Sequence, residues 1–367
     1  MSENFDNKIK RLELENFTCF AKADMDFSSG INVFIGENGT GKTHILKILS
    51  SLSWHFPAEP SVFNENFPIS KSNATGIMQT DCLAESFKSF PAKLLRKDSL
   101  SSNLKFVIGE NFKVGFELQS SEQKTSLLSA FTSYSDLRSW WKDLSPLFIP
   151  TSEMLSFHKG FTEGYEKREN YFDVMYYRLG KALNALPLKE MPKSMAKLIR
   201  DLEKVIGGEV FQKDQSFQIA FDGNDIQESP VVASGINKLA QMIYLIKNGS
   251  LTKDTILFWD EPEVNLNPRY IKIVAQFLQT LAKNGVQIFV ATHDYLLAHL
   301  LSLDASYRRE TEAPPMKFFA FYKGEDGTEI ESADTIAGIQ NNAILDEYSA
   351  YYDLEQELYY QSREQTV

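Results

Sequence analysis

Cysteine and long apolar runs are both scarce in this sequence. Only Cys19 and Cys82 occur among 367 residues, and their separation fits neither a metal-ligand spacing nor a CxxC motif. A disulfide framework or a zinc site is therefore not expected, and a reducing, cytoplasmic compartment is. No segment approaches the roughly 20 apolar residues of a membrane-spanning helix. The first ten residues also lack the apolar core of a signal peptide, so we expect a soluble protein without membrane contacts.

Positive charge is scarce as well. The 38 Lys and Arg residues face 49 Asp and Glu residues, which gives a formal net charge of −11. A field of this sign repels nucleic acid at long range, although a local basic patch would still allow binding. No heptad pattern lasts for three repeats, so a long coiled-coil arm is not expected. Nucleic acid is thus a possible partner that the charge does not indicate.

The pattern of apolar residues divides the chain into three regions. Residues 1–125 open with strands and a glycine-rich loop, residues 126–206 carry helical stripes typical of a helical insertion, and residues 207–367 return to alternating strands and helices. Turn signals predict one hairpin near Gly109 and another at Asp326–Gly327, followed by a tyrosine-rich helix. We expect the first and third regions to be the two halves of one domain, separated by the helical insertion.

Two apolar strands in the third region are joined by a helix. The sequences TILFW and VQIFVAT show no polar alternation, and the segment Pro268–Lys283 between them has an apolar stripe at helical spacing. Strands of this kind are buried on both faces, as in a parallel βαβ unit. The region is therefore expected to form an α/β core.

The segment GENGTGKT fits the phosphate-binding pattern G-x-x-x-x-G-K-[ST], and it lies between an apolar strand and an amphipathic helix. Its glycines let successive backbone N–H groups point at phosphate oxygens, and the helix N-terminus adds its dipole. We expect Lys42 to reach the β- and γ-phosphates of ATP and the Thr43 hydroxyl to ligate Mg²⁺. The expected nucleotide-binding residues are Gly36, Glu37, Asn38, Gly39, Thr40, Gly41, Lys42 and Thr43. The next residue, His44, is either structural or adjacent to the nucleotide.

Acidic and imidazole side chains follow the two apolar strands. Asp260 and Glu261 end the first strand, and His293 follows the second. Because neighbouring parallel strands end at the same edge of a sheet, we expect these three side chains to lie together. Asp260 is predicted to hold the Mg²⁺ shell, Glu261 to polarise the attacking water, and His293 to contact the γ-phosphate or orient the nucleophile. Glu261 and His293 are thus the expected catalytic residues.

The segment VASGINKLAQMIYLIK begins another amphipathic helix. Its apolar stripe starts at Ile236, so Ser234 is expected to be the N-cap. A serine N-cap is common and needs no ligand. An uncovered helix N-terminus with Ser234 and Gly235 is also an anion site.

The order of these motifs resembles the ABC-type ATPase head, and the opening LELENFTCF with GINVFIGENGTGKT resembles its SMC, RecF and OLD branch, in which an element such as Asn16-Phe17-x-x-Phe20 follows the first strand. The segments FIPTSEMLSFHKGF, ILFWDEPEVNLNP and THDYLLAHLL look like small bacterial AAA-family ATPases of the OLD/RecF-like group, many of them associated with phage-defence operons. The resemblance implies an α/β fold, a P-loop NTPase of ABC/SMC-head type, with a mixed sheet core, an N-terminal antiparallel β part and a helical insertion.

The same resemblance assigns further residues. Ala233–Asn237 occupies the place of the Leu-Ser-Gly-Gly-Gln signature, which binds the γ-phosphate of the ATP held by the opposite subunit. Serine and the first glycine are kept, whereas isoleucine and asparagine replace the last two residues. Glu263–Asn267 occupies the place of the D-loop, with asparagine for its usual aspartate. Gln79 is a candidate for the Q-loop, and Lys10 or Arg11 for a basic residue near the nucleotide.

The leading hypothesis is an ATPase whose two copies, or a higher even number, sandwich ATP and Mg²⁺ head to head. Because the sequence shows no nuclease or membrane motif, the output is expected in a separate effector or toxin from a neighbouring gene, in bacterial anti-phage defence. The alternative is a RecF- or SMC-like ATPase acting on DNA ends or gaps in repair. A regulatory nucleotide binder that barely turns over is a third reading, which the altered signature favours.

Overall fold

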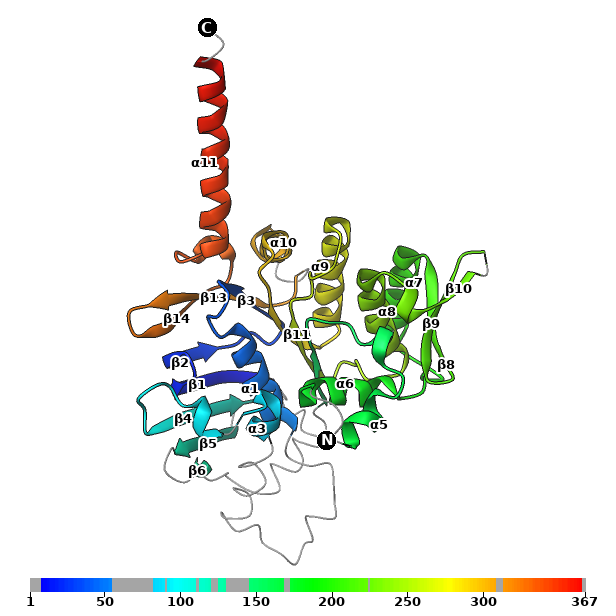
Figure 1. Ribbon diagram of the computed structural model, residues 1–367, viewed down its shortest axis with the longest axis horizontal. Helices are drawn as coiled ribbons and strands as arrows, with labels where there is room; N and C mark the ends of the chain where they lie inside the picture. Colours follow the sequence, from blue (N-terminus) through cyan, green and yellow to red (C-terminus); the bar gives the residue numbers. More distant parts are fainter. Residues whose placement is uncertain are drawn as a thin grey trace, which may run out of the picture.

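A computed structural model describes residues 8–54, 82–89, 91–109, 112–119, 125–129, 145–167, 172–223, 225–307 and 313–364. Three sheets and the helices around them make up these residues (Figure 1). Gln79, the Q-loop candidate, lies outside the described residues. None of the described helices is both long and apolar enough to cross a bilayer.

A six-stranded sheet forms the centre, with the order β14-β13-β3-β12-β11-β7. All neighbours pair in parallel except β14, which is antiparallel to β13. The predicted βαβ unit is confirmed, because β11 and β12 pair directly and α9 connects them. The strands of this sheet are β3 (Ile31–Gly36), β7 (Ser145–Ile149), β11 (Thr255–Asp260), β12 (Gln287–Ala291), β13 (Met316–Gly324) and β14 (Gly327–Ala333).

Both faces of the central sheet are buried, which explains its unbroken apolar strands. On β3, Val33 and Ile35 face one core, whereas Phe34 faces another. The first core contains α8 (Ser234–Lys247) and α9 (Pro268–Lys283), and the second contains α1 (Lys42–Trp54) and the antiparallel sheet. Rings of the second core meet edge to face, for example Phe34 and Phe319 with centroids 5.5 Å apart.

The antiparallel sheet has the order β2-β1-β4-β5-β6, and α3 (Cys82–Phe87) and η2 (Pro91–Leu94) lie between β3 and β4 in the chain. The predicted hairpin near Gly109 is confirmed by the pairing of Ile108 with Phe112. Its strands are β1 (Ile9–Phe17), β2 (Phe20–Asp26), β4 (Ser101–Ile108), β5 (Phe112–Gln119) and β6 (Thr125–Ser129).

The outer lobe combines helices with a three-stranded sheet of order β10-β9-β8. Its helices include α5 (Phe161–Glu166), α6 (Val174–Leu183), α7 (Lys193–Ile206) and α8, with the short turns η3 (Leu155–Phe157) and η4 (Ser229–Val231). Its strands are β8 (Gly208–Lys213), β9 (Ser216–Phe221) and β10 (Asp225–Glu228). The range 126–206, predicted as a helical insertion, also supplies β7, which pairs with β11 in the central sheet. That range is therefore not purely helical. The strand was missed because β7 is short, and its apolar pattern alone does not distinguish a strand from a helix.

The C-terminal part begins with α10 (Tyr295–Tyr307), which packs on α9. The predicted hairpin at Asp326–Gly327 is confirmed, since Gly324 pairs with Gly327 between β13 and β14. After η5 (Ile336–Gly338), the tyrosine-rich helix α11 (Ala343–Glu364) projects away from the body (Figure 1).

Candidate functional site

Glycines shape the loop between β3 and α1. Gly36 has φ 139°, and a Cβ there would lie 2.1 Å from the backbone oxygen of Phe321. Gly41 has φ 90°, and a Cβ there would meet the Cys19 and Phe20 side chains. Both positions require glycine because of backbone conformation and close packing. The Thr40 hydroxyl donates to the Glu37 carbonyl at 2.8 Å and closes the loop above the start of α1.

Lys42 is the first residue of α1 and is only 5% exposed. Its Nζ donates to the carbonyl oxygens of Gly36 and Glu37, each at 2.8 Å. Burial lowers the pKa of Lys42 to about 8, although the carboxylates of Asp260 and Glu261 oppose this shift. The ammonium thus lies inside the loop, where it could exchange its carbonyl partners for phosphate oxygens.

The predicted Mg²⁺ residues face one another. The Thr43 hydroxyl donates to Oδ2 of Asp260 at 3.0 Å and lies 3.2 Å from Oδ1. Burial raises the pKa of Asp260 to about 6, and the Thr43 hydrogen bond limits that rise. Among the described residues no cluster of three or more His, Cys, Asp or Glu could hold a metal alone. The pair fits Mg²⁺, which typically keeps several waters and takes its other oxygens from phosphates.

Glu261 and His293 also come together, as predicted from the parallel strands. Nε2 of His293 lies 3.3 Å from Oε1 of Glu261. Burial, and then the positive charge of Lys42, lowers the pKa of His293, whereas Glu261 and the Gly36 carbonyl oppose that shift. This shift favours the neutral imidazole, which can share one proton with a neighbouring acceptor. Such a pair can orient a water and accept its proton.

The backbone of Glu261 is held in a left-handed conformation, with φ 48°. Its N–H donates to the Ala291 carbonyl at 2.9 Å, so the turn after β11 is tied to the end of β12. A non-glycine residue in this conformation is strained, and the surrounding contacts must hold it. Strained backbone of this kind is typical of functional sites, so the conformation favours a functional role for Glu261.

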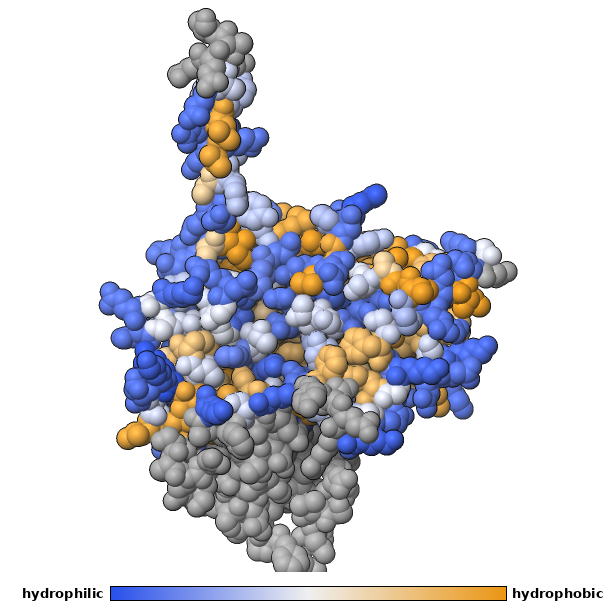
Figure 2. Space-filling model, in the orientation of Figure 1, coloured by the Kyte–Doolittle hydropathy of each residue, from blue (hydrophilic) through white to orange (hydrophobic). Residues whose placement is uncertain are grey.

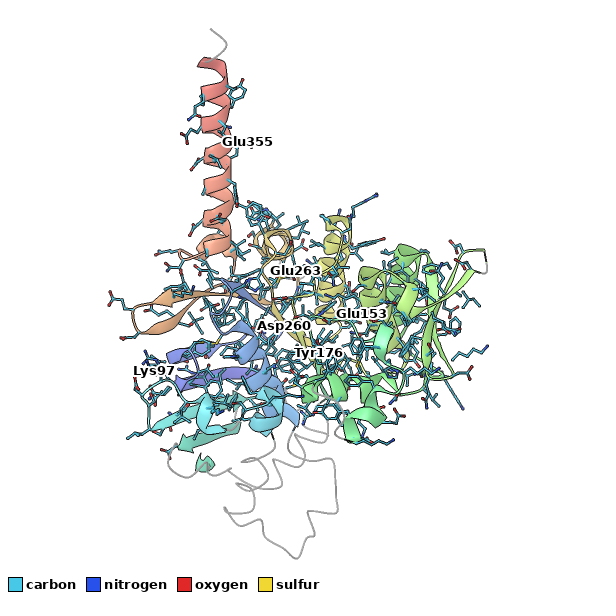
Figure 3. The ribbon with its side chains drawn as sticks, viewed as in Figure 1. Lys97, Glu153, Tyr176, Asp260, Glu263 and Glu355 are labelled. Atoms are coloured by element: carbon cyan, nitrogen blue, oxygen red, sulfur yellow. The ribbon has the colours of Figure 1, made fainter. Side chains whose placement is uncertain are left out.

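Glu263 was assigned only to the D-loop range by the sequence, and it proves to be an organising carboxylate. Its Oε1 accepts from the Thr292 hydroxyl at 2.7 Å and from the His293 N–H at 2.9 Å. Burial raises the pKa of Glu263. Glu263, labelled in Figure 3, therefore holds the backbone from which His293 projects. Only the pairing of β11 with β12 could have revealed this role.

Lys238 is the second residue whose position the sequence did not predict. It is 1% exposed, and its Nζ donates to the carbonyls of Glu261 at 3.1 Å and Val264 at 2.8 Å. Burial lowers the pKa of Lys238 to about 8, against the carboxylates of Glu263, Glu261 and Glu153. Helix α8 is thus held to the turn that carries Glu261. Lys238 lies on the face of α8 opposite the stripe residues Ile236 and Leu239, and that face is buried as well, so its helical position did not indicate this burial.

The N-terminus of α8 differs in one detail from the prediction. Ala233 is the N-cap and Ser234 is the first helical residue, without a capping hydrogen bond, so the prediction of Ser234 as N-cap is wrong. The Ser234 hydroxyl instead accepts from Nδ2 of Asn265 at 3.4 Å. A Cβ on Gly235 would lie 2.6 Å from the Asn265 carbonyl, which explains the glycine. The buried Asn237 side chain holds the preceding loop through Ser229 and Val232.

The end of β7 brings polar side chains to the same site. Glu153 is buried, its carboxylate accepts from the Ser156 N–H and hydroxyl, and its charge acts on Lys238. Tyr176 of α6 is hydrogen-bonded to Ser152, and burial raises the pKa of its phenol. Figure 3 shows Glu153 and Tyr176 beside Asp260, between the sheets and the outer lobe. The sequence missed this group because β7 was not predicted.

Other candidates point elsewhere. Nδ1 of His44 lies 3.1 Å from the Thr18 hydroxyl, and its ring meets Phe87 edge to face. Arg11 forms ion pairs with carboxylates of β1 and β2, among them Asp24. The side chain of Asn267 caps α9 by accepting from the Arg269 N–H at 3.0 Å. These three side chains have structural partners, whereas the proposal of Lys10 near the nucleotide stays a prediction.

The geometry can now be compared with known proteins. A family model described as "AAA domain, putative AbiEii toxin, Type IV TA system" matches residues 31–298, from β3 into α10. The chain belongs to this AAA family. The matched range contains the Gly36–Thr43 loop, the start of α8, Asp260, Glu261 and His293.

Curated relatives match shorter stretches. "DNA replication and repair protein RecF" of Streptococcus suis (strain 05ZYH33) is 44% identical over 45 residues, 12% of this chain and 12% of that protein. "DNA double-strand break repair Rad50 ATPase" of Thermococcus kodakarensis is 27% identical over 140 residues, 38% of this chain and 14% of that protein. The chain thus spans a small part of these relatives' length.

Solved structures agree over nearly the whole chain. An SMC head bound to the C-winged helix domain of ScpA has a TM-score of 0.51 at 13% identity and covers 90% of this chain and 98% of that one. An SMC head with an extended coiled coil, bound to the C-terminal domain of ScpA derived from Pyrococcus furiosus, has a TM-score of 0.50 at 12% identity, with 89% and 96% covered. The predicted ABC/SMC-head fold is confirmed.

Proposed function

We propose that this chain binds and hydrolyses ATP with Mg²⁺ at the Gly36–Thr43 loop. The observation that carries the proposal is the convergence of four side chains from two distant segments, Lys42 and Thr43 with Asp260 and Glu261, on one site. Thr43 and Asp260 would hold Mg²⁺, which offsets negative charge on the β- and γ-phosphates when it is bound.

The chain's own residues supply the remaining steps. The Lys42 ammonium leaves the carbonyls of Gly36 and Glu37 for phosphate oxygens, and the loop N–H groups bind the same charge. Glu261 orients a water and accepts its proton, and neutral His293 stands 3.3 Å away to fix that carboxylate. Lys238 and Glu263 hold the backbones of Glu261 and His293 in register.

A second copy completes the site in this proposal. Ser234 starts a helix whose first N–H groups have no capping side chain, and such a helix end binds anions. Two copies would close head to head, each presenting Ser234 to the ATP of the other. The family description names a "putative AbiEii toxin" of a toxin–antitoxin system. We further propose that the ATP state of this chain regulates a separate effector or toxin protein in anti-phage defence. The cytoplasm is the compartment we propose.

The direct test is ATP turnover by the purified chain with Mg²⁺ and by its Glu261→Gln variant. We expect the variant to bind ATP with unchanged affinity and to hydrolyse it roughly 100-fold more slowly, because only the water-activating carboxylate is lost. Glu13→Gln, on the exposed side of β1, is the matched control. Wild-type turnover by Glu261→Gln would rule out the mechanism.

The RecF and Rad50 similarities favour a second candidate, in which the same head acts on DNA ends or gaps. DNA affinity that requires ATP and falls steeply with salt would support it. The net charge of −11 counts against it.

A further inference from the structure

One face of the outermost helix, α11, is rich in tyrosine and is exposed beyond its base. Tyr348, Tyr351, Tyr352, Glu355 and Leu358 recur at helical spacing, and we call this face of α11 the tyrosine stripe. Tyr348 packs on Tyr295 of α10 with centroids 4.7 Å apart and anchors the base of the helix. Farther out, Tyr351 is 62% exposed and Leu358 56%. Figure 2 shows hydrophobic residues along the projecting helix.

The charge of α11 limits what can cover this stripe. Residues 343–364 contain six carboxylates and one arginine, a net charge of −5. Glu355, labelled on α11 in Figure 3, is itself a residue of the stripe by its helical spacing. Two α11 helices paired along their stripes would bring like charges together, which is destabilising. The occupant must therefore be apolar with a positively charged rim.

The outer lobe of the same chain has a surface of this kind. A groove of about 350 Å³ lies between the α6–α7 connection, β8 and α8, lined by Leu186, Leu188, Met191, Phe211 and Tyr244 among others. Leu186 is 80% exposed, so its side chain gains a partner only when something covers the groove. Figure 2 shows hydrophobic residues gathered on this lobe.

The rim of the groove has the opposite charge to α11. Residues 181–213 contain seven Lys and Arg against four Asp and Glu, a net charge of +3 in a chain of −11. Lys247, in the groove, is already paired with Glu203 and Glu209. The exposed Lys189, Lys193 and Lys213 adjoin the lining residues, and within the described ranges no ion pair holds them. They are placed to receive an acidic helix.

We propose that α11 of one copy docks its tyrosine stripe into this groove of a second copy. The helix projects from the β13–β14 side and the groove lies on the opposite lobe, so one chain does not join its own two surfaces (Figure 1). An amphipathic helix in an apolar groove is a common recognition mode. Reciprocal exchange of α11 closes a twofold dimer. This contact needs no nucleotide, and it is separate from the proposed ATP-dependent one.

The test is sedimentation of the full chain without nucleotide or Mg²⁺, which keeps it independent of the ATP mechanism. We expect the wild type to form a dimer at micromolar concentration, since the groove is small for a tight interface. Leu358→Glu and Leu186→Glu are each expected to weaken dimerisation at least tenfold. Gln361→Glu, on another face of α11, and Leu100→Glu, at an 81% exposed leucine elsewhere, are the matched controls and should leave it unchanged.

Cysteine pairs then identify the two surfaces in contact. A mixture of tagged Leu358→Cys and untagged Leu186→Cys chains should form a mixed disulfide dimer, and Ala350→Cys in place of Leu358→Cys should not. A wild type that stays monomeric at 100 times that concentration would overturn the proposal. Loss of dimer in Leu358→Glu with full dimerisation in Leu186→Glu would also overturn it, because α11 would then have another partner surface.

Discussion

The P-loop side of the candidate site lies within a closed set of contacts from its own chain, whereas the start of α8 is left largely open. Lys42 and Asp260 are buried, and each has a hydrogen-bond partner. Ser234 is half-buried, and its hydroxyl lies 3.4 Å from Nδ2 of the exposed Asn265. In the proposed function, the first side binds nucleotide within one chain, and the second meets the nucleotide of another copy. Variants on the P-loop side and at the start of α8 should therefore differ in their effects on ATP affinity and on dimerisation.

The largest effect is expected on the P-loop side. Lys42→Ala removes an ammonium that is placed for two charge-assisted contacts, so ATP affinity should fall by roughly 100-fold or more. Fluorescent-nucleotide titration measures this loss. Lys323→Ala is the control, because Lys323 also contacts the loop, at Glu37, but from an exposed position. Equal losses in both variants would contradict the assignment.

On the open side, Ser234→Arg should block a second copy without touching the P-loop. We expect ATP affinity to stay within twofold of wild type while hydrolysis and ATP-driven dimerisation fall roughly 100-fold. Light scattering with ATP and the Glu261→Gln background measures the dimer. Ser194→Arg places the same change in the first turn of α7 and should have no effect. Normal ATP-driven dimerisation in Ser234→Arg would leave that residue a structural role only.

Lys238 joins the two sides, so its loss should have an intermediate effect. Lys238→Met keeps the side-chain volume but leaves the carbonyls of Glu261 and Val264 without their donor, at a cost of about 1–3 kcal/mol. Hydrolysis should fall about tenfold while ATP affinity is retained. Lys247→Met, in the last turn of the same helix, controls for the loss of a lysine. Turnover rates beside ATP binding decide the case.

The smallest effect comes from pH and acts on the P-loop side alone. The pKa of Lys42 is lowered to about 8, so its charge and ATP affinity should decline as pH rises through that value. The pKa of Asp260 is raised to about 6, so it should lose its charge and its Mg²⁺ contact as pH falls through that value. Affinity should therefore peak between about 6 and 8 and change about tenfold per unit outside this range. A flat profile from pH 5 to 9 would contradict both shifts.

Sequence reasoning predicted most of the P-loop side because its signals are local. The glycine spacing, the helix after it and the two apolar strands each follow from neighbouring residues, and Pro268–Lys283 has the bounds of α9. The meeting of Asp260, Glu261 and His293 follows from the rule that parallel strands end at one edge.

The remaining parts depended on contacts between distant segments. Strand β7 has only five residues, of which the last four are apolar and buried, so only its pairing with β11 reveals it, and Glu153 follows it into the site. The parallel pairing of β13 with β3 has no local signal either. Glu263 and Lys238 bond to backbone atoms more than 20 residues away, which no spacing encodes.

The central claim is that a second copy completes the ATP site. It is tested most directly by mixing two inactive variants. Lys42→Ala lacks a working P-loop, and Ser234→Arg lacks a working helix start. In a mixed dimer the P-loop of the Ser234→Arg copy meets the intact Ser234 of the Lys42→Ala copy, so one site per dimer is whole. We predict that the equimolar mixture regains up to about a quarter of wild-type ATP turnover, the value for random pairing of the copies. Turnover no higher than the average of the two variants alone would contradict the account.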